Sequence, residues 1–468
     1  MTISLPDSQA ELKSLLQHLD KVILGKVIEY AGASYKATLE KIDDAIAGCR
    51  SGGLRIEHRR EVYYQTCLGP IKVMRRVYRD VEGRRRYLLD EVMGMNKRNH
   101  VTKGVQVLAL DLASSMPYRR SAEVLRKASA IDLTYQTIWR LVAKTADPYL
   151  KKTEQELKWF QETGEIPDGE GKRVARLMVE ADGVMLSLQR EKERKTEVKL
   201  GIAYEGWEKV GKDRYKTVNK TIFAAVAGGD TFWEGMSLKL QKRYDLSSVG
   251  ETIVGGDGAG WIKEGARYVN GRFQLDHYHL NRELTTALGQ DKETKERVWH
   301  ACEQGDIKNA LQIMADAAGQ ARGEVAQRIT KAYHYLYDNR FGLEDYRLKL
   351  GEERTGLRRT GAMEGNVDKL VVRRMKNQGM SWSLKGIRRL LCVRFLVLEG
   401  KLPGWLSDKK SYAPQIGIPV KKIHRIVTRL SAQEPDAWLQ AGLPALYGPY
   451  ASRPWVKVLR NITETPSL

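Results

Sequence analysis

Two aspartates in this sequence, Asp182 and Asp257, are placed where they could do chemistry together. Asp182 lies within the apolar run of residues 176–190, and Asp257 follows a second apolar run, residues 252–254. In α/β sheets, functional groups collect at the carboxyl ends of strands, where the next helix begins. Converging carboxylates are suitable ligands for Mg²⁺ or Mn²⁺, and a pair of such ions suits phosphodiester chemistry. We therefore predict a phosphoryl-transfer site that takes two metal ions.

A third aspartate, Asp276, repeats the pattern of Asp257. Residues 273–275 form a short apolar run that ends at this acid, and a helix start follows it. Both acids should therefore lie on the same edge of one sheet. A single aspartate beside glycine is usually a turn residue, but the joint placement of Asp182 and Asp257 in this strand order favours a metal site. Glu180 faces the same way as Asp182 by the period of two, and we expect it to be structural.

The elements around these acids predict an α/β fold with an RNase H-like catalytic domain. Three consecutive strands and a helix are predicted at residues 176–190, 195–209, 215–228 and 233–243. Strand, helix, strand and helix then follow from residue 251. This is the element order of the RNase H fold, in which the first strand, with an acid in its middle, lies beside the fourth, with an acid at its end.

Two histidines, His277 and His279, follow Asp276 closely. A histidine at such a centre could orient the scissile phosphate or carry a proton, and Asp276 could hold the tautomer of His279. A zinc site is the alternative, but the flanking residues offer no cysteine and no helical His pair with Glu between. We therefore predict that Asp276 and His279 support catalysis.

Residues 118–146 have the pattern of a helix-turn-helix. We expect Ser121 to cap the first helix and Thr134 to begin the second, which carries Ile138, Leu141 and Val142 inward. In such motifs the second helix enters the major groove of DNA. The expected DNA contacts are Arg119, Arg120, Tyr135, Gln136, Trp139 and Arg140. A helical hairpin without a role in DNA binding is the alternative.

The 468 residues carry a formal charge of +21, from 79 basic and 58 acidic side chains. This excess indicates a polyanionic partner, and double-stranded DNA before a membrane, since no apolar stretch approaches the length of a membrane span. The four scattered cysteines and the N-terminal residues, which have no signal-peptide pattern, predict a cytoplasmic protein.

Basic residues are concentrated in two stretches. A predicted hairpin around Gly69 and Pro70, between residues 51 and 88, has ten Lys or Arg against four acids, so it either follows phosphates or is an edge strand protected by charge. Residues 369–401 have nine basic residues against Glu399 alone, which favours DNA backbone contacts. The contacts expected there are Arg373, Arg374, Lys376, Trp382 and Arg388.

Several strings occur in an order that resembles a known family: EADGVMLSLQR, GGDGAGWI, LDHYHLNREL and EGNVDKLVVRRMKNQGMSWSLKG. Together they resemble a bacterial insertion-sequence transposase family of the ISLre type, related to Mutator-like DDE transposases and often catalogued as uncharacterised proteins. The resemblance runs from about Arg55 to Leu390. It implies metal-dependent DNA cleavage at the ends of the element and strand transfer into target DNA, by a homodimer or larger assembly.

The resemblance also implies a catalytic triad of Asp182, Asp257 and Glu364, with Asp276 and His279 matching an Asp-x-x-His element. Locally, Glu364 stands at a predicted helix start, where the helix dipole favours a carboxylate. A capping glutamate is the alternative there. Two other functions stay open: a nuclease of the same fold that only hydrolyses DNA, and a DNA-binding protein without catalysis.

The predicted organisation follows from these elements. Nearly ninety residues separate Asp276 from Glu364, too many for a loop, and most look helical, so we predict a helical insertion. The predicted regions are an N-terminal helical segment (1–50), a basic hairpin (51–95), a helix-turn-helix domain (96–160), the catalytic core (172–283 and 359–402), the insertion (284–358) and a C-terminal extension (403–468).

Overall fold

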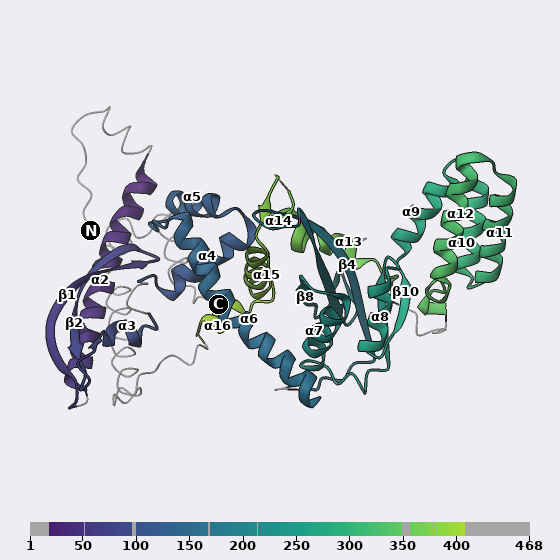
Figure 1. Cartoon of the computed structure of the whole chain (residues 1–468). Helices are drawn as coiled ribbons and strands as arrows, with labels where there is room; N and C mark the ends of the chain where they lie inside the picture. Colours follow the sequence, from purple (N-terminus) through teal and green to yellow (C-terminus); the bar gives the residue numbers. More distant parts are fainter. Residues whose placement is uncertain are drawn as a thin grey trace, which may run out of the picture. The chain divides into compact units, whose positions relative to one another are not determined.

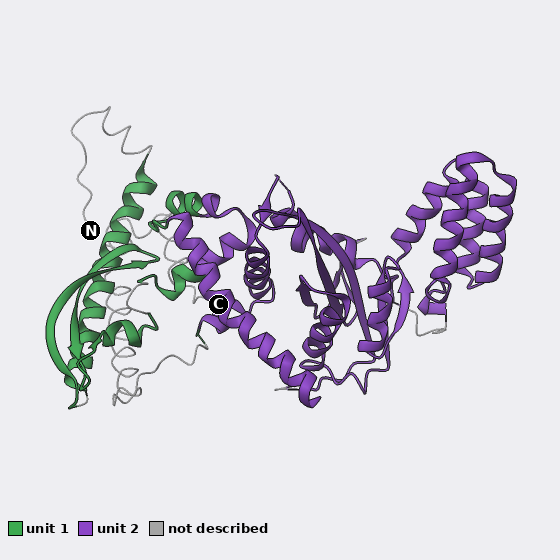
Figure 2. Cartoon of the chain, in the orientation of Figure 1, with its two compact units in different colours: residues 1–107, 122–133, 407–468 green, residues 108–121, 134–406 purple. Residues whose placement is uncertain are grey.

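The computed structural model describes residues 18–50, 52–95, 100–166, 169–212, 214–348, 356–377 and 379–407. The chain divides into two compact units, residues 1–107, 122–133 and 407–468, and residues 108–121 and 134–406 (Figure 2). The start of the predicted N-terminal helical segment and the extension beyond residue 407 lie outside the described residues.

The first unit contains a long helix against a small sheet. Helix α2 (Leu19–Gly48) contacts the antiparallel strands β1 (Arg55–Thr66) and β2 (Gly69–Arg79), with β3 (Arg85–Arg86) and α3 (Leu88–Val92) completing the layer (Figure 1). Alternate side chains of the strands, among them Val62, Tyr64 and Val73, are buried with Leu39 and Ile46 of the helix. The predicted hairpin is present, but its turn is at residues 67–68, just before Gly69.

Most of the positive charge of this hairpin is neutralised within the unit. Arg75 and Asp90 form a buried ion pair at 3.0 Å, and Arg76 contacts Asp43 at 2.7 Å. Ion pairs are also formed by Arg59, Lys72, Arg79, Arg84, Arg85 and Arg86. Since eight of the ten basic residues have acidic partners, a charge-protected strand pair explains the hairpin better than a surface that follows phosphates.

Three helices follow, and the prediction for Ser121 is wrong. Helix α4 (Lys103–Ser115) precedes α5 (Tyr118–Ala128), so Ser121 lies inside α5, where its hydroxyl bonds back to the carbonyl of Pro117, and does not cap it. Thr134 caps α6 (Tyr135–Thr163) by accepting from the backbone of Thr137 at 3.2 Å, as predicted.

Pro148 lies inside α6. Proline removes one helical hydrogen bond. Here the neighbouring turns are held by tertiary contacts, because Ala146 is fully buried and Asp147 forms an ion pair with Arg389. Those contacts offset the missing bond, so the helix continues to Thr163.

A six-stranded sheet lies at the centre of the second unit. Its strand order is β10-β9-β4-β5-β8, and β11 also pairs with β4. Strands β4, β5 and β8 are antiparallel neighbours, whereas β9 and β10 run parallel to β4. The strands are β4 (Arg176–Leu188), β5 (Lys195–Tyr204), β8 (Thr221–Ala225), β9 (Glu251–Gly256), β10 (Arg272–Leu275) and β11 (Ser381–Trp382).

A separate hairpin interrupts two of the predicted strands. Strands β6 (Trp207–Gly211) and β7 (Arg214–Thr217) pair only with each other and stand between β5 and β8 in the chain. The strand predicted to reach Lys209 therefore ends at Tyr204. Gly206, with φ of 147°, makes the break, because this backbone conformation favours glycine.

Helices cover both faces of the large sheet. Leu177, Val179 and Ala181 of β4 face α7 (Gly229–Gln241) and α8 (Gly260–Tyr268). Met178, Val184 and Leu186 face the opposite layer. That layer contains α13 (Ala362–Val367), the π-helical turn η3 (Asp368–Val372), α14 (Arg373–Met375) and α15 (Leu384–Leu398), and the described chain ends with α16 (Leu402–Ser407). By the period of two, Glu180 and Asp182 also face α13.

The segment between Asp276 and Glu364 is largely helical, as predicted. Figure 1 shows its helices grouped together, and they share a core around Leu284, Met314 and Leu336. They are α9 (His277–Leu288), α10 (Lys292–Glu303), α11 (Ile307–Gln320), α12 (Gly323–Asp338) and a short 3₁₀ turn, η1 (Arg340–Gly342). In the part of the chain that the structure describes, none of the helices has the length and apolar character of a membrane span.

Candidate active site

Asp182 lies on β4, and Asp257 directly follows the neighbouring parallel strand β9. Glu180 of β4, two residues before Asp182, is opposite Gly255 of β9, two residues before Asp257. Both aspartates are half-buried. The Asp257 carboxylate also accepts from the backbone of Ala259, 2.9 Å away, at the entrance to α8. The sheet thus brings together the two acids that the strand order singled out.

The electrostatics of Asp182 link it to the other predicted acids. The pKa of Asp182 is raised to about 6, chiefly by burial and also by the charges of Asp257 and Glu364, while the Gly183 backbone amide and the charge of His279 oppose the shift. Carboxylates that repel one another in this way are neutralised by a bound cation. The donor set therefore fits hard divalent ions such as Mg²⁺ or Mn²⁺.

The acids by themselves do not enclose a metal ion, so an ion bound here would need further ligands. Within the described residues there is no group of three or more His, Cys, Asp or Glu side chains that could hold a metal ion. Mg²⁺ commonly uses one or two carboxylates together with substrate phosphates and water. Asp182, Asp257 and Glu364 would therefore hold an ion only together with such phosphate and water ligands.

Glu180 fastens the helix that carries Glu364. Its buried carboxylate accepts hydrogen bonds from the backbone amides of Gly361 (3.1 Å) and Met363 (2.8 Å), at the start of α13. Its other oxygen accepts from the Tyr204 hydroxyl. Glu364 itself is exposed in the first turn of α13. The structural role of Glu180 is therefore to connect the strand that carries Asp182 to the helix that carries Glu364.

Asp276 and His279 are adjacent at the next strand end. Asp276 begins α9 by accepting from the Tyr278 amide at 2.9 Å, and its own amide donates to the Gly256 carbonyl at 2.8 Å. His279 Nδ1 lies 3.5 Å from the Asp276 carboxylate, which raises the pKa of His279. Asp276 therefore stands beside both the Asp257 strand and His279.

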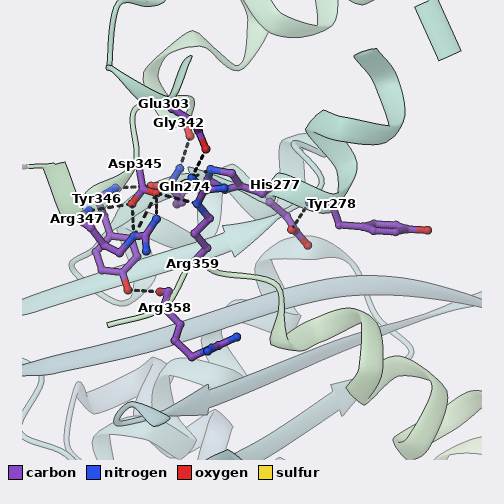
Figure 3. Close-up of polar contacts among 11 residues, drawn as sticks. Gln274, His277, Tyr278, Glu303, Gly342, Asp345, Tyr346, Arg347, Arg358 and Arg359 are labelled. Carbon is purple, nitrogen blue, oxygen red and sulfur yellow. Dashed lines mark hydrogen bonds and ion pairs between the residues drawn. The ribbon is translucent and has the colours of Figure 1, made fainter. Parts of the chain in front are cut away.

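His277 faces a different cluster, shown in Figure 3. Its Nε2 lies 3.9 Å from the Asp345 carboxylate, which also binds Arg347 at 2.7 Å and contacts Arg359 at 3.5 Å. Burial and the charge of Arg359 lower the pKa of His277. Arg359 points into this cluster, whereas Arg358 points away from it.

The helical insertion supports the Asp257 turn directly. The Tyr335 hydroxyl, on α12, donates to the Asp257 carbonyl at 2.7 Å. Gly258 has φ of 91°, and a Cβ there would lie 2.5 Å from the Asn339 side chain. Both the backbone conformation and this close approach require glycine. The role of Tyr335, and the Asp345 cluster, had no signal in the sequence, because the contacts are made between distant segments.

The residues predicted to contact DNA near α6 are exposed. They are Arg119, Arg120, Tyr135, Gln136, Trp139 and Arg140. The Arg119 guanidinium lies 5.1 Å from the centre of the Tyr135 ring.

In the second basic stretch, one prediction needs correction. Arg374 is buried, its Nε donates to the Ala113 carbonyl at 2.9 Å, and burial lowers its pKa to about 10, so it holds the fold together and is not free to contact DNA. Trp382 is half-buried and donates to the Met375 carbonyl at 2.8 Å. Arg373, Lys376 and Arg388 are exposed.

The second unit is thus a mixed α/β structure with acids gathered at one edge of its sheet. Residues 10–407 match the uncharacterised protein family UPF0236, and the chain belongs to that family. UPF0236 protein TTE2489 of Caldanaerobacter subterraneus subsp. tengcongensis is 26% identical over 384 residues, which cover 80% of this chain and 77% of the relative. A Streptococcus gallolyticus protein described as lying in the vanSb 3′ region is 23% identical over 424 residues, or 87% and 89% of the two chains.

A further relative from C. subterraneus is 25% identical over 382 residues, covering 80% of this chain and 76% of the relative. Its printed name joins eleven designations, from TTE0033 to TTE2212.

Proposed function

We propose that this protein is a DDE transposase of a bacterial insertion sequence, with an RNase H-like catalytic domain. The observation that carries the proposal is the arrangement of Asp182, Asp257 and Glu364. Asp182 lies on β4, Asp257 directly follows the adjacent parallel strand β9, and Glu364 is on a helix anchored to β4 by Glu180. The strand order β10-β9-β4-β5-β8, with parallel pairing from β10 to β4 and antiparallel pairing from β4 to β8, is the one expected for that fold.

The family supports the proposal in a second way. A relative whose name joins eleven designations in one organism is expected if its gene occurs in many copies. An element that inserts copies of itself into a genome produces that pattern. The exposed residues at the start of α6, including Tyr135, Gln136 and Arg140, would then contact the ends of the element in the major groove.

The residues divide the chemistry between them. Mg²⁺ or Mn²⁺, held by Asp182, Asp257 and Glu364, would supply a Lewis acid and activate the attacking water or hydroxyl. Asp276 keeps His279 oriented and raises its pKa, so His279 is suited to protonate the leaving 3′ oxygen or to contact the phosphate. Glu180 fixes the helix of Glu364 relative to β4.

The test uses the full-length protein, a plasmid that carries its gene with the flanking DNA, and Mg²⁺. We expect cleavage and strand-transfer products from the wild type, and loss of at least about a hundredfold in rate from Asp257→Asn with DNA binding retained. Asp291→Asn is the matched control, since Asp291 also accepts a backbone amide at a helix start but lies outside the site.

Three outcomes would contradict the proposal. Cleavage without joining would indicate a nuclease that only hydrolyses DNA. Binding without cleavage by the wild type would indicate a DNA-binding protein without catalysis. Equal activity of Asp257→Asn and Asp291→Asn would remove Asp257 from the site.

A further inference from the structure

A basic cleft of about 930 Å³ lies beside the helix that carries Glu364. One wall is the β6–β7 hairpin, and the other is formed by residues 357–362 and by Gly365, Asn366 and Lys369. Among the lining residues that the structure describes, seven are Lys or Arg and none is Asp or Glu. One of these cations, Lys369, belongs to the basic stretch of residues 369–401 for which DNA backbone contacts were predicted.

The cations of the cleft differ in their partners. Arg347 and Arg359 share Asp345, and Lys216 pairs with Glu208 at 2.9 Å. No ion pair is recorded between any described acid and the other four, which are Arg214, Lys220, Arg358 and Lys369. This contrasts with the β1–β2 hairpin, where most cations have acidic partners. A merely solvated face is expected to mix both signs, so the unbalanced charge indicates an anionic ligand.

Among these cations, Lys220 gives the strongest indication of an anionic ligand. It is half-buried, and its Nζ donates to the Asn366 side chain at 2.8 Å. Burial and the charge of Lys369 lower its pKa. Two cations so placed repel each other, and a phosphate between them would relieve the repulsion.

Aromatic side chains accompany the charges. The exposed ring of Tyr215 lies under the Arg358 guanidinium, at 3.9 Å, and Trp207 also lines the cleft. Aromatic faces interleaved with cations are typical of surfaces that bind single strands, because unpaired bases stack on the rings. The volume is also that of a pocket for small ligands, about 300–1,000 Å³, so a few nucleotides of one strand fit and a duplex does not.

We propose that this cleft binds an unpaired DNA strand and leads it to Glu364. Lys220, Arg358 and Lys369 contact its phosphates, and Tyr215 stacks on a base. The helix α13 connects the two sites, since Gly365 and Asn366 line the cleft while Glu364 is exposed on the same helix. The inference rests on the proposed DNA chemistry of Glu364, but strand binding can be measured without catalysis.

The test measures binding of a fluorescent oligonucleotide of about 20 nucleotides, single-stranded and as a duplex, by anisotropy in EDTA. The variant Lys220→Gln/Arg358→Gln/Lys369→Gln is compared with Lys158→Gln/Arg173→Gln/Arg267→Gln, which removes three highly exposed cations outside the cleft. We expect the cleft variant to bind the single strand at least about tenfold more weakly, with a salt slope smaller by about 2, and the control to change little.

Melting temperatures verify that both variants fold, and the single changes Arg358→Gln and Lys369→Gln, at exposed positions, replace the triple variant if it does not. Equal weakening by both triple variants, equal loss of duplex and single-strand binding, or tighter binding of the RNA of the same sequence would each overturn the inference. Those results would leave the cleavage test of the proposed function unaffected. If the cleft variant loses single-strand binding but the wild type cleaves no DNA, the inference about the cleft is supported and the proposed transposase function is contradicted.

Discussion

At the scale of single residues, the structure gives Glu180 a role in anchoring α13 that its position in the sequence did not indicate. Its carboxylate is buried and satisfies three donors, two backbone amides at the start of α13 and the Tyr204 hydroxyl. Burial raises its pKa. A buried acceptor with three donors is costly to remove, because each donor would be left without a partner.

We expect Glu180→Ala to lower the free energy of unfolding by about 3 kcal/mol, since three buried donors lose their acceptor. Glu180→Gln retains a carbonyl oxygen for the backbone amides of α13 and should cost clearly less. Urea denaturation of both variants and the wild type measures the difference. Equal stability of Glu180→Ala and the wild type would show that Glu180 does not anchor α13.

His277 and His279 should give opposite pH dependences of stability. The pKa of His277 is lowered from 6.5 by burial and by Arg359, so the unfolded chain binds more protons and stability falls as the pH drops through 6.5. The pKa of His279 is raised, chiefly by Asp276, so its contribution is complete below 6.5 and is lost as the pH rises through the higher folded value.

In EDTA, His277→Gln should therefore lose less stability than the wild type between about pH 7.5 and 5.5, and His279→Gln should lose more. Melting temperatures across this range measure both effects. The same pH dependence in the two variants would contradict the assignment of opposite shifts.

At the scale of elements, the sheet and its helices depend on close approaches that leave no room for side chains. Gly265 of α8 is buried against the Trp233 indole of α7, and a Cβ there would lie 2.1 Å from the ring. The ring is fully buried and its Nε1 donates to the Trp261 carbonyl at 2.6 Å, so it cannot move aside easily.

Gly265→Ala should thus destabilise the second unit by about 1–3 kcal/mol through overpacking. Gly319→Ala is a suitable control, because Gly319 is also helical but a Cβ there meets nothing within 4 Å. That change should be neutral or slightly stabilising, since alanine favours the helix. Denaturant titration compares the two, and a Gly265→Ala variant as stable as Gly319→Ala would contradict the packing.

At the scale of the whole molecule, the charge of +21 is unevenly balanced. The β1–β2 hairpin pairs most of its cations, Arg374 is buried, and the described acids leave four cations of the cleft without an ion pair. Total charge is thus a poor guide to which surface meets a polyanion.

If several surfaces bind DNA together, affinity for duplex DNA should fall steeply with salt. With six or more phosphate contacts, binding should weaken about a thousandfold between roughly 50 and 200 mM salt. Anisotropy titrations of the full chain in EDTA measure this dependence. A change of less than about tenfold would mean that few phosphates are contacted.

The sequence by itself determined the local features. Local sequence patterns predicted the strands of the large sheet other than β11, the helical insertion and the cap at Thr134, because these depend on neighbouring residues along the chain. The order of strands was sufficient to place Asp182 beside Asp257. Sequence reasoning failed where a single glycine splits a predicted strand, as at Gly206.

Only the tertiary structure decided which charges are available and what holds the acids in place. The anchoring of α13 by Glu180, the bond from Tyr335 to the Asp257 turn and the burial of Arg374 all join segments far apart in the sequence. Burial and pairing are properties of such contacts, and no periodic pattern encodes them. The basic cleft belongs to the same class, because its two walls are about 140 residues apart in the chain and meet only in the fold.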